Sequence, residues 1–134
     1  MSAESEILEK FHIVAVVGLS PSEERASFHV ASYLKAHGFM IVPVNPTAGE
    51  ILGEKCYPEL ADVTCGVEVV DVFRRASEVP AIVDQAIKMG AKAVWMQEGI
   101  VNEEAAERAR SAGLLVVMDK CMLKEHRRLK EEGL

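Results

Sequence analysis

Five short apolar runs, rich in β-branched residues, recur along the chain and are separated by polar or helical segments. The runs occupy positions 13–17, 40–44, 66–73, 93–96 and 114–118. Apolar runs of this length without alternation indicate strands that are buried on both faces, as in a parallel sheet covered by helices. The pattern therefore predicts an α/β fold with a five-stranded parallel sheet.

Apolar residues at helical spacing fill the segments between these runs. Ile7, Leu8 and Phe11 would share one face of a short helix over 4–11. Further helices are expected near 27–37, 77–89, 103–112 and 122–132, with a short helical turn within 55–63. Helical crossovers predict a three-layer, doubly wound, Rossmann-like fold, most simply in the strand order 3-2-1-4-5. In such a sheet ligands bind where the strands end, beside the first strand.

The polar loop after the first strand is a candidate binding segment. Gly18 follows the apolar run at once and allows a ligand to approach the backbone closely. Ser20 and Ser27 supply hydroxyl groups before the next helix, and Arg25 adds a guanidinium group. The start of a helix attracts anions through its unpaired N–H groups and its dipole. The loop thus indicates a phosphate or pyrophosphate site, although a purely structural turn uses similar residues.

Polar or functional residues also follow the other four strands. In chain order these are Asn45-Pro46, Phe73-Arg74-Arg75, Met96-Gln97-Glu98-Gly99 and Asp119-Lys120-Cys121. The apolar side chains offer surface to a base or an alkyl arm, and the Gln97 amide can pair with another amide. We expect the local field at this edge to be positive because of four cations, Arg25, Arg74, Arg75 and Lys120.

Composition narrows the function further. With 134 residues, 49% of them hydrophobic, the chain is expected to form one domain with a substantial core. A net charge of -6 argues against a nucleic-acid partner, and no apolar run or leader suggests a membrane or export. Cys56, Cys65 and Cys121 form no Cys-x-x-Cys pair, so we expect no disulfide framework, no metal site and a reducing cytoplasm.

An NAD-dependent enzyme fits the pattern poorly. The dinucleotide fingerprint needs further glycines after Gly18, where this chain has Ser20 and Glu23. It also needs an acid at the end of the second strand, which here reads Val44-Asn45-Pro46. None of the four histidines has an evident nucleophile partner in the sequence, so we expect no catalysis by the chain alone.

Several ordered motifs together resemble the small stand-alone CoA-binding protein family, whose fold is that of the CoA-binding domain of succinyl-CoA synthetase. The motifs lie at 16–27, 43–53, 70–75, 95–99 and 117–126. The resemblance implies a single CoA-binding domain over 1–134 that binds coenzyme A or an acyl-CoA.

The resemblance also implies a role for individual residues. It assigns the pyrophosphate to Gly18, Ser20, Arg25 and Ser27, the border of the adenosine to Asn45 and Pro46, and the path of the nucleotide and pantetheine to Phe73, Arg74, Met96 and Gln97. The neighbouring residues Leu19 and Val44 are also expected to contact the cofactor. Ala26 stands where the family often has proline, and Thr47 where it often has a basic residue. Lys55 and Arg74 are therefore both candidates to neutralise the 3′-phosphate of CoA.

Cys121 is the thiol expected nearest to this site. It is either a small buried apolar residue or a partner for the CoA thiol in a mixed disulfide. Two other functions stay open, an NAD(H)-binding redox sensor or small oxidoreductase, and a subunit of a larger acyl-CoA ligase. A homo-oligomer or a partner subunit is compatible with these functions, and the acyl group is left open.

Overall fold

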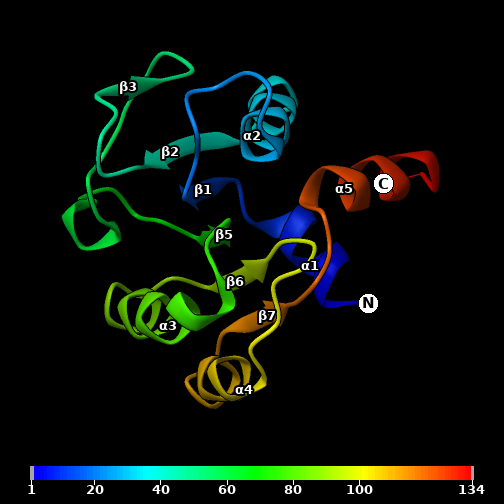
Figure 1. Cartoon of the computed structure of the whole chain (residues 1–134). Coiled ribbons are helices and arrows are strands. Elements are labelled where there is room, and N and C mark those ends of the chain that lie inside the picture. The colour runs from blue at the N-terminus through cyan, green and yellow to red at the C-terminus, as the bar shows by residue number, and fades with distance from the viewer. Residues whose placement is uncertain (1, 134) are drawn as a thin grey trace.

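Five parallel strands form the central sheet of the computed structural model, which describes residues 2–133 (Figure 1). The strands are β1 (Ile13–Val17), β2 (Met40–Val44), β5 (Val69–Val72), β6 (Ala93–Met96) and β7 (Leu115–Val117). Nearly all of their residues are buried, as the unbroken apolar runs predicted. The predicted α/β class and the five-stranded parallel sheet are confirmed.

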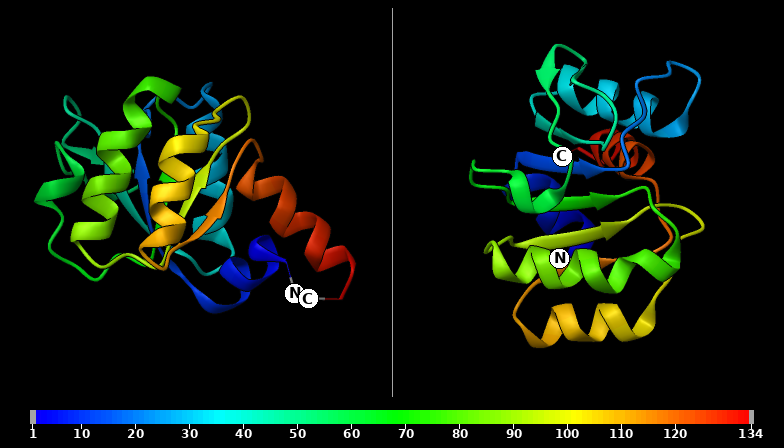
Figure 2. Two further views of the ribbon diagram at one scale, coloured as in Figure 1. Left: turned by 90° about the horizontal axis from the view of Figure 1, so that it is seen from below. Right: turned by 60° about the vertical axis from the view of Figure 1, so that its left-hand side comes forward.

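Helices cover both faces of the sheet, giving three layers (Figure 2). They are α1 (Ala3–Lys10), α2 (Ala26–Ala36), α3 (Val79–Lys88), α4 (Glu103–Ser111) and α5 (Met122–Glu131), with 3-10 turns η1 (Leu60–Asp62) and η2 (Ala76–Glu78). In β1, Ala15 and Val17 pack in the core under α3 and α4, whereas Val14 and Val16 pack under α1, α2 and α5. No helix among residues 2–133 is long and apolar enough to cross a membrane.

The predicted strand order is wrong. The sheet runs β2-β1-β5-β6-β7, so the third long strand lies beside the first and not outside the second. Pro43 explains why β2 is an edge strand, because proline has no N–H for the ladder. The carbonyl of Pro43 accepts a hydrogen bond from the Tyr57 N–H on the outer side, at 3.0 Å, so the missing donor also faces outward. The fully buried β5 instead pairs on both sides, with β1 and β6.

A hairpin, which the sequence pattern did not predict, replaces a crossover helix between β2 and β5. It consists of β3 (Glu50–Ile51) and β4 (Glu54–Lys55). Lys35 at the end of α2 donates to the carbonyl of Leu52 and forms an ion pair with Glu54 at 3.1 Å. The hairpin is thereby attached to α2, and the chain continues past β1 to begin β5.

In this order the chain adds β2 on one side of β1 and then adds β5, β6 and β7 on the other side. The topological switch point of the sheet therefore lies between β1 and β5. The carboxyl ends of both strands face the viewer in Figure 1 and point upward on the left of Figure 2. The N–H of Phe73 donates to the carbonyl of Val17 at 2.8 Å, so the two strand exits are held together. Ligands of doubly wound folds bind at such a point. Both ends of the ribbon lie on the opposite side, near the amino ends of the strands (Figure 2).

Candidate ligand-binding groove

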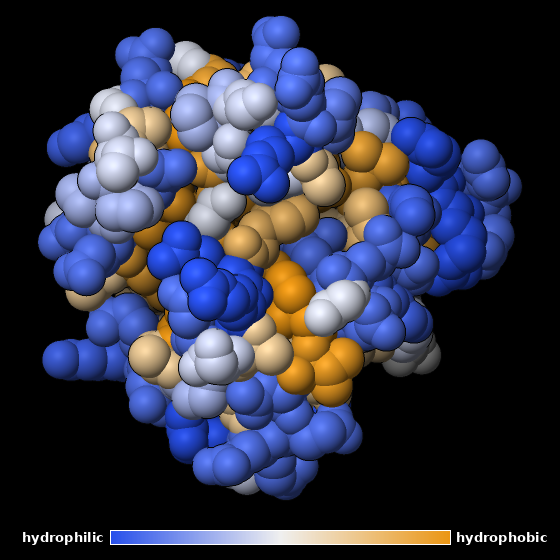
Figure 3. Space-filling view, viewed as in Figure 1, coloured by the Kyte–Doolittle hydropathy of each residue, from blue (hydrophilic) through white to orange (hydrophobic). Residues whose placement is uncertain are grey.

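Four adjoining cavities lie at the carboxyl edge of the sheet, around the exits of β1 and β5. Figure 3 views this edge and shows apolar surface exposed along its middle, between hydrophilic side chains. Arg74 lines three of these cavities, and so does Phe73. We treat the cavities as one groove because they share these two residues and Gly18.

The middle of the groove is a cavity of about 290 Å³, here called the loop cavity, lined by Gly18, Ser20, Arg25, Ala26, Ser27 and Phe73. The Ser27 hydroxyl oxygen accepts a hydrogen bond from the Ser20 N–H at 3.0 Å, which folds the loop over the start of α2. Within residues 2–133 the N–H groups of Ala26 and Ser27 have no partner, and the Arg25 side chain forms no ion pair. Unpaired N–H groups at a helix start, beside a guanidinium group, can bind an anion.

Gly18 brings this loop close to the exit of β5. Its φ of 91° is unfavourable for other residues. A Cβ atom on Gly18 would lie 2.6 Å from the carbonyl oxygen of Phe73 and 2.9 Å from Cδ of Arg74. Any other residue at position 18 would therefore displace the backbone where the loop after β1 passes the exit of β5.

The largest cavity, about 680 Å³, lies between the loop and α3 and is here called the α3-side cavity. Its apolar walls include Val44, Pro46, Leu60 and Ile82, and its polar lining comes from Arg74, Ser77, Glu78 and Gln85. Arg74 forms an ion pair with Glu78 at 3.0 Å. A cavity of this size with apolar walls and a few polar groups suits a ring system with polar substituents.

The α5-side cavity, about 350 Å³, lies on the other side of Phe73. It is lined by Ala26, Val30, Phe73, Arg74, Arg75, Gln97, Glu98, Ile100 and Cys121. Cys121 is the N-cap residue of α5 and its thiol is unpaired. Next to the α3-side cavity, at η2, Arg74, Arg75 and Ser77 line a further cavity of about 370 Å³.

Gln97 connects the wall of the α5-side cavity to the core. Its Nε2 donates to Oδ1 of Asp71 at 2.5 Å, and its Oε1 accepts a long hydrogen bond from the Met122 N–H at 3.4 Å. Burial raises the pKa of Asp71 to about 7, against the opposing effect of the Gln97 hydrogen bond. The other oxygen, Oδ2, is buried without a hydrogen-bond partner. Asp71 was not among the residues predicted from the sequence, although a lone carboxylate in an apolar run is a signal of a special position.

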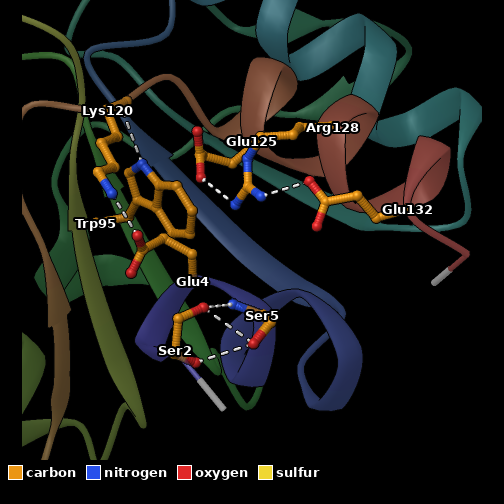
Figure 4. Close-up of polar contacts among 8 residues, drawn as sticks. All are labelled: Ser2, Glu4, Ser5, Trp95, Lys120, Glu125, Arg128 and Glu132. Carbon is orange, nitrogen blue, oxygen red and sulfur yellow. Dashed lines mark hydrogen bonds and ion pairs between the residues drawn. The ribbon is translucent and has the colours of Figure 1, made fainter.

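The loop that carries Cys121 is held from below by the indole of Trp95 and by α1 (Figure 4). The Trp95 Nε1–H donates to the Lys120 carbonyl at 2.8 Å, and the Lys120 ammonium donates to Glu4. This bond to Glu4 raises the pKa of Lys120. Lys120 lines none of the four cavities, and its ammonium is paired with Glu4 of α1, so its contribution to the charge of the groove stays a prediction.

Most of the residues proposed from the sequence lie together in the groove, and three do not line it. Those that line a cavity are Gly18, Ser20, Arg25, Ser27, Val44, Pro46, Phe73, Arg74, Gln97 and Cys121. Leu19 and Met96 have buried side chains in the two cores. Asn45 donates to the Leu19 carbonyl at 2.9 Å and accepts from the Thr47 and Ala48 N–H groups, so it supports the loop from behind.

Several groove residues were missed because they depend on the strand order. Ser77 and Glu78 lie in η2, and Ile82 and Gln85 lie in α3, the two elements that follow β5. The order 3-2-1-4-5 would have placed this helix at the far edge of the sheet, away from Gly18. Local sequence patterns carry little information on which strands pair, so these residues gave no signal of their own.

Comparison with known proteins identifies the family. A family model described as "CoA binding domain" matches residues 12–127. The chain belongs to this CoA-binding domain family. It is 37% identical over 121 residues to an uncharacterized protein, YneT, of Bacillus subtilis, covering 90% of each chain. A solved structure of a hypothetical protein from Pyrococcus horikoshii is 43% identical, with a TM-score of 0.92 over 97% of this chain and 93% of that one.

The chain is also similar to one part of a larger enzyme. An ADP-forming acetate–CoA ligase II of Archaeoglobus fulgidus is 37% identical over 93 residues, which are 67% of this chain and 14% of the ligase. The chain is thus homologous to the CoA-binding part of such ligases.

Proposed function

We propose that this protein binds coenzyme A or an acyl-CoA along the groove and has no catalytic activity of its own. The observation that carries the proposal is the order of the cavities. The loop cavity, whose hydrogen-bond donors suit an anion, lies between the larger α3-side cavity and the smaller α5-side cavity. CoA has the same order of parts, with a diphosphate between an adenosine and a pantetheine arm.

In this arrangement the diphosphate binds at the start of α2. The N–H groups of Ala26 and Ser27 and the guanidinium group of Arg25 supply donors there. A chain of net charge -6 needs local cations to hold such a ligand, and Arg25, Arg74 and Arg75 all line the groove. Leu19 and Asn45 would then act by supporting the loop.

The adenosine occupies the α3-side cavity, beside Val44 and Pro46. Arg74 is the better of the two candidate cations for the 3′-phosphate, because it lines this cavity. Lys55 lines none of the four cavities, and its ammonium lies 5.0 Å from the ring centre of Tyr57. Binding of the phosphate would compete with the Arg74–Glu78 ion pair.

The pantetheine arm occupies the α5-side cavity and brings its thiol toward Cys121. With oxidised CoA, the Cys121 thiolate would attack the CoA disulfide, form a mixed disulfide and release one CoA thiol. Intact mass after incubation with CoA disulfide should show one added CoA, which dithiothreitol removes and which Cys121→Ser prevents. An unchanged mass for the wild-type protein would contradict this part of the proposal.

A thermal-shift and calorimetric comparison of CoA, acetyl-CoA, NADH and ATP tests the proposed function. A ligand that binds only the folded state adds about 2.7 kcal/mol of stability at 100 times its dissociation constant. We expect this from the CoA species, and we expect Arg25→Ala to remove most of the shift. Arg110→Ala, on the exposed side of α4, is the matched control and should leave the shift unchanged. A larger shift with NADH would favour a redox sensor.

A second candidate is a subunit that binds CoA for a partner ligase, which the similarity to the Archaeoglobus fulgidus enzyme favours. It requires the chain to co-purify with a stoichiometric nucleotide-binding protein. Recovery of the chain alone, with full affinity for CoA, would support the stand-alone function.

A further inference from the structure

Asp71 is the only acidic side chain that is buried among residues 2–133. It lies in the middle of the sheet, in register with Val16 of β1 and Trp95 of β6. One carboxyl oxygen accepts from Gln97, and the other has no hydrogen-bond partner. An unpaired carboxylate in such a place is unstable, and burial raises the pKa of Asp71 to about 7. We therefore expect the Asp71 carboxyl to gain or lose its proton near neutral pH.

No cation among residues 2–133 is paired with this carboxylate. Asp71 takes part in no ion pair within the described residues, and β1 carries no charged side chain. Titratable or charged groups on the surrounding elements include Arg25 and His29 near the start of α2, Arg74 after β5 and Glu98 after β6. On the same face they also include Cys121 at the N-cap of α5, His126 on α5, and the ion pair of Glu4 on α1 with Lys120 after β7. None of these forms a hydrogen bond with Asp71.

Gln97 links this carboxyl to the ligand groove. Its amide is held at both ends, with Nε2 donating to Asp71 and Oε1 accepting from the Met122 N–H. One N–H and one lone pair of the amide remain, and the side chain forms part of the wall of the α5-side cavity. An amide fixed in this way matches a secondary amide of a ligand, which has one acceptor and one donor. A pantetheine arm carries two such amides.

We propose that Asp71 is a positioning residue, which fixes the Gln97 amide for the ligand and takes up a proton when an anionic ligand such as CoA fills the groove. This inference rests on the proposed function. The ligand would bring negative phosphates near the poorly screened Asp71 carboxylate and would displace water from the part of the α5-side cavity that Gln97 lines. Both changes disfavour the ionised form of Asp71. A neutral Asp71 keeps the hydrogen bond, because Oδ1 still accepts from Gln97 while Oδ2 carries the proton.

The direction of the pH dependence follows from this uptake. If the complex binds more protons than the free protein, affinity falls as pH rises through the titration range around 7. A rise of one pKa unit on binding corresponds to an increase in Kd of about tenfold across that range. Asp71→Asn cannot take up the proton but keeps an oxygen that accepts from Gln97, so its affinity should stay near the low-pH value.

Calorimetric titration with dephospho-CoA, in two buffers of different ionisation enthalpy near pH 7, measures the uptake. This ligand lacks the 3′-phosphate, which itself titrates near pH 6. We expect the wild-type protein to take up about half a proton and Asp71→Asn to take up none. The control Glu104→Gln, an exposed carboxylate on α4, should behave like the wild-type protein.

A second variant separates positioning from stability. Asp71→Leu removes both the charge and the acceptor for Gln97, and a buried leucine should leave the melting temperature equal or higher. We expect it to bind CoA at least tenfold more weakly at every pH, while Asp71→Asn does not. Equal affinity of Asp71→Leu and the wild-type protein would overturn the positioning role, and equal proton uptake in Asp71→Asn would overturn the coupling. Failure of the wild-type protein to bind CoA would instead overturn the proposed function.

The titration of Asp71 can also be followed without ligand. Carboxyl 13C NMR of the free protein should show one resonance that titrates near pH 7 and is absent in Asp71→Asn. A resonance that stays ionised to below pH 5 would contradict the coupling, whatever ligand the groove holds.

Discussion

Gly18 fixes the distance between the loop after β1 and the exit of β5. The space that a side chain would need is filled by the carbonyl of Phe73, 2.6 Å from the position of a Cβ atom, and the φ of 91° adds strain. We expect Gly18→Ala to lower the free energy of unfolding by about 1–3 kcal/mol and to weaken CoA binding, because the loop must move. Denaturant titration and calorimetry measure the two effects.

Gly66→Ala is the matched control for this prediction. Its Cβ atom would meet nothing within 4 Å, and its φ is not in the left-handed region. Its stability should stay within about 0.5 kcal/mol of that of the wild-type protein. Equal stability of the two variants would mean that the backbone around Gly18 can accommodate a Cβ atom without strain.

For individual residues, the sequence predicted most of those that line the groove but only some of the interactions that position them. Gly18, Ser20, Ser27 and Arg25 were recognisable, because a glycine loop between a strand and a helix has a known physical use. Asn45 was expected beside the ligand, but it holds the Leu19 carbonyl and supports the loop. Asp71 was missed because its importance depends on Gln97, which is close in space and distant in sequence.

Among the elements, α5 packs on α2 through a cluster of aromatic and histidine side chains away from the groove. The Tyr33 hydroxyl and Nδ1 of His126 share a hydrogen bond of 2.9 Å, and the ring of His37 stacks on Tyr33. Burial lowers the pKa of His126, and the nearby positive charges of His37, Lys130 and His12 lower it further. The folded state therefore favours the neutral ring.

This lowered pKa predicts that acid weakens the packing of α5. Because the unfolded chain binds a proton at His126 more readily, the free energy of unfolding should fall as pH drops below about 6.5. His126→Gln removes the titrating ring and should flatten this part of the pH profile, at a cost of about 1 kcal/mol near pH 7 for the altered hydrogen bond. Denaturant unfolding between pH 5 and 7 measures both.

His29→Gln is the control, since His29 is exposed on α2 and lies outside the Tyr33–His37–His126 cluster. Its pH profile should follow that of the wild-type protein. If His126→Gln retains the full acid sensitivity, then the cluster does not cause it.

The elements themselves were predicted well and their arrangement was not. Each apolar run became a strand, although β5 is limited to Val69–Val72. The order of the strands was missed because pairing is a long-range property. Pro43 held the relevant information, since a proline within a strand favours a sheet edge. The β3–β4 hairpin was missed because two-residue strands leave almost no periodic pattern.

For the whole molecule, the groove connects the α3-side cavity with the α5-side cavity, and the proposed ligand would fill both at once. Linking two weakly bound parts avoids a second loss of rigid-body entropy, so affinity rises steeply when both cavities are used. We expect CoA to bind at least a hundredfold more tightly than pantetheine, and adenosine 3′,5′-bisphosphate to compete with CoA. Competition calorimetry measures these affinities.

Two outcomes would contradict the joint use of the cavities. CoA that binds no more tightly than adenosine 3′,5′-bisphosphate would mean that the α5-side cavity contributes nothing. Binding of pantetheine that is unaffected by the bulky substitution Ile100→Trp, which narrows that cavity, would lead to the same conclusion.

Because both ends of the ribbon lie away from the groove, another protein can be fused to either end of this domain. Both ends of the ribbon lie near the amino ends of the strands, whereas the groove opens at the carboxyl ends (Figure 2). A tag, linker or added domain attached at either end would leave the mouth of the groove uncovered. The same layout would allow this domain to be built into a longer polypeptide without redesign of the groove.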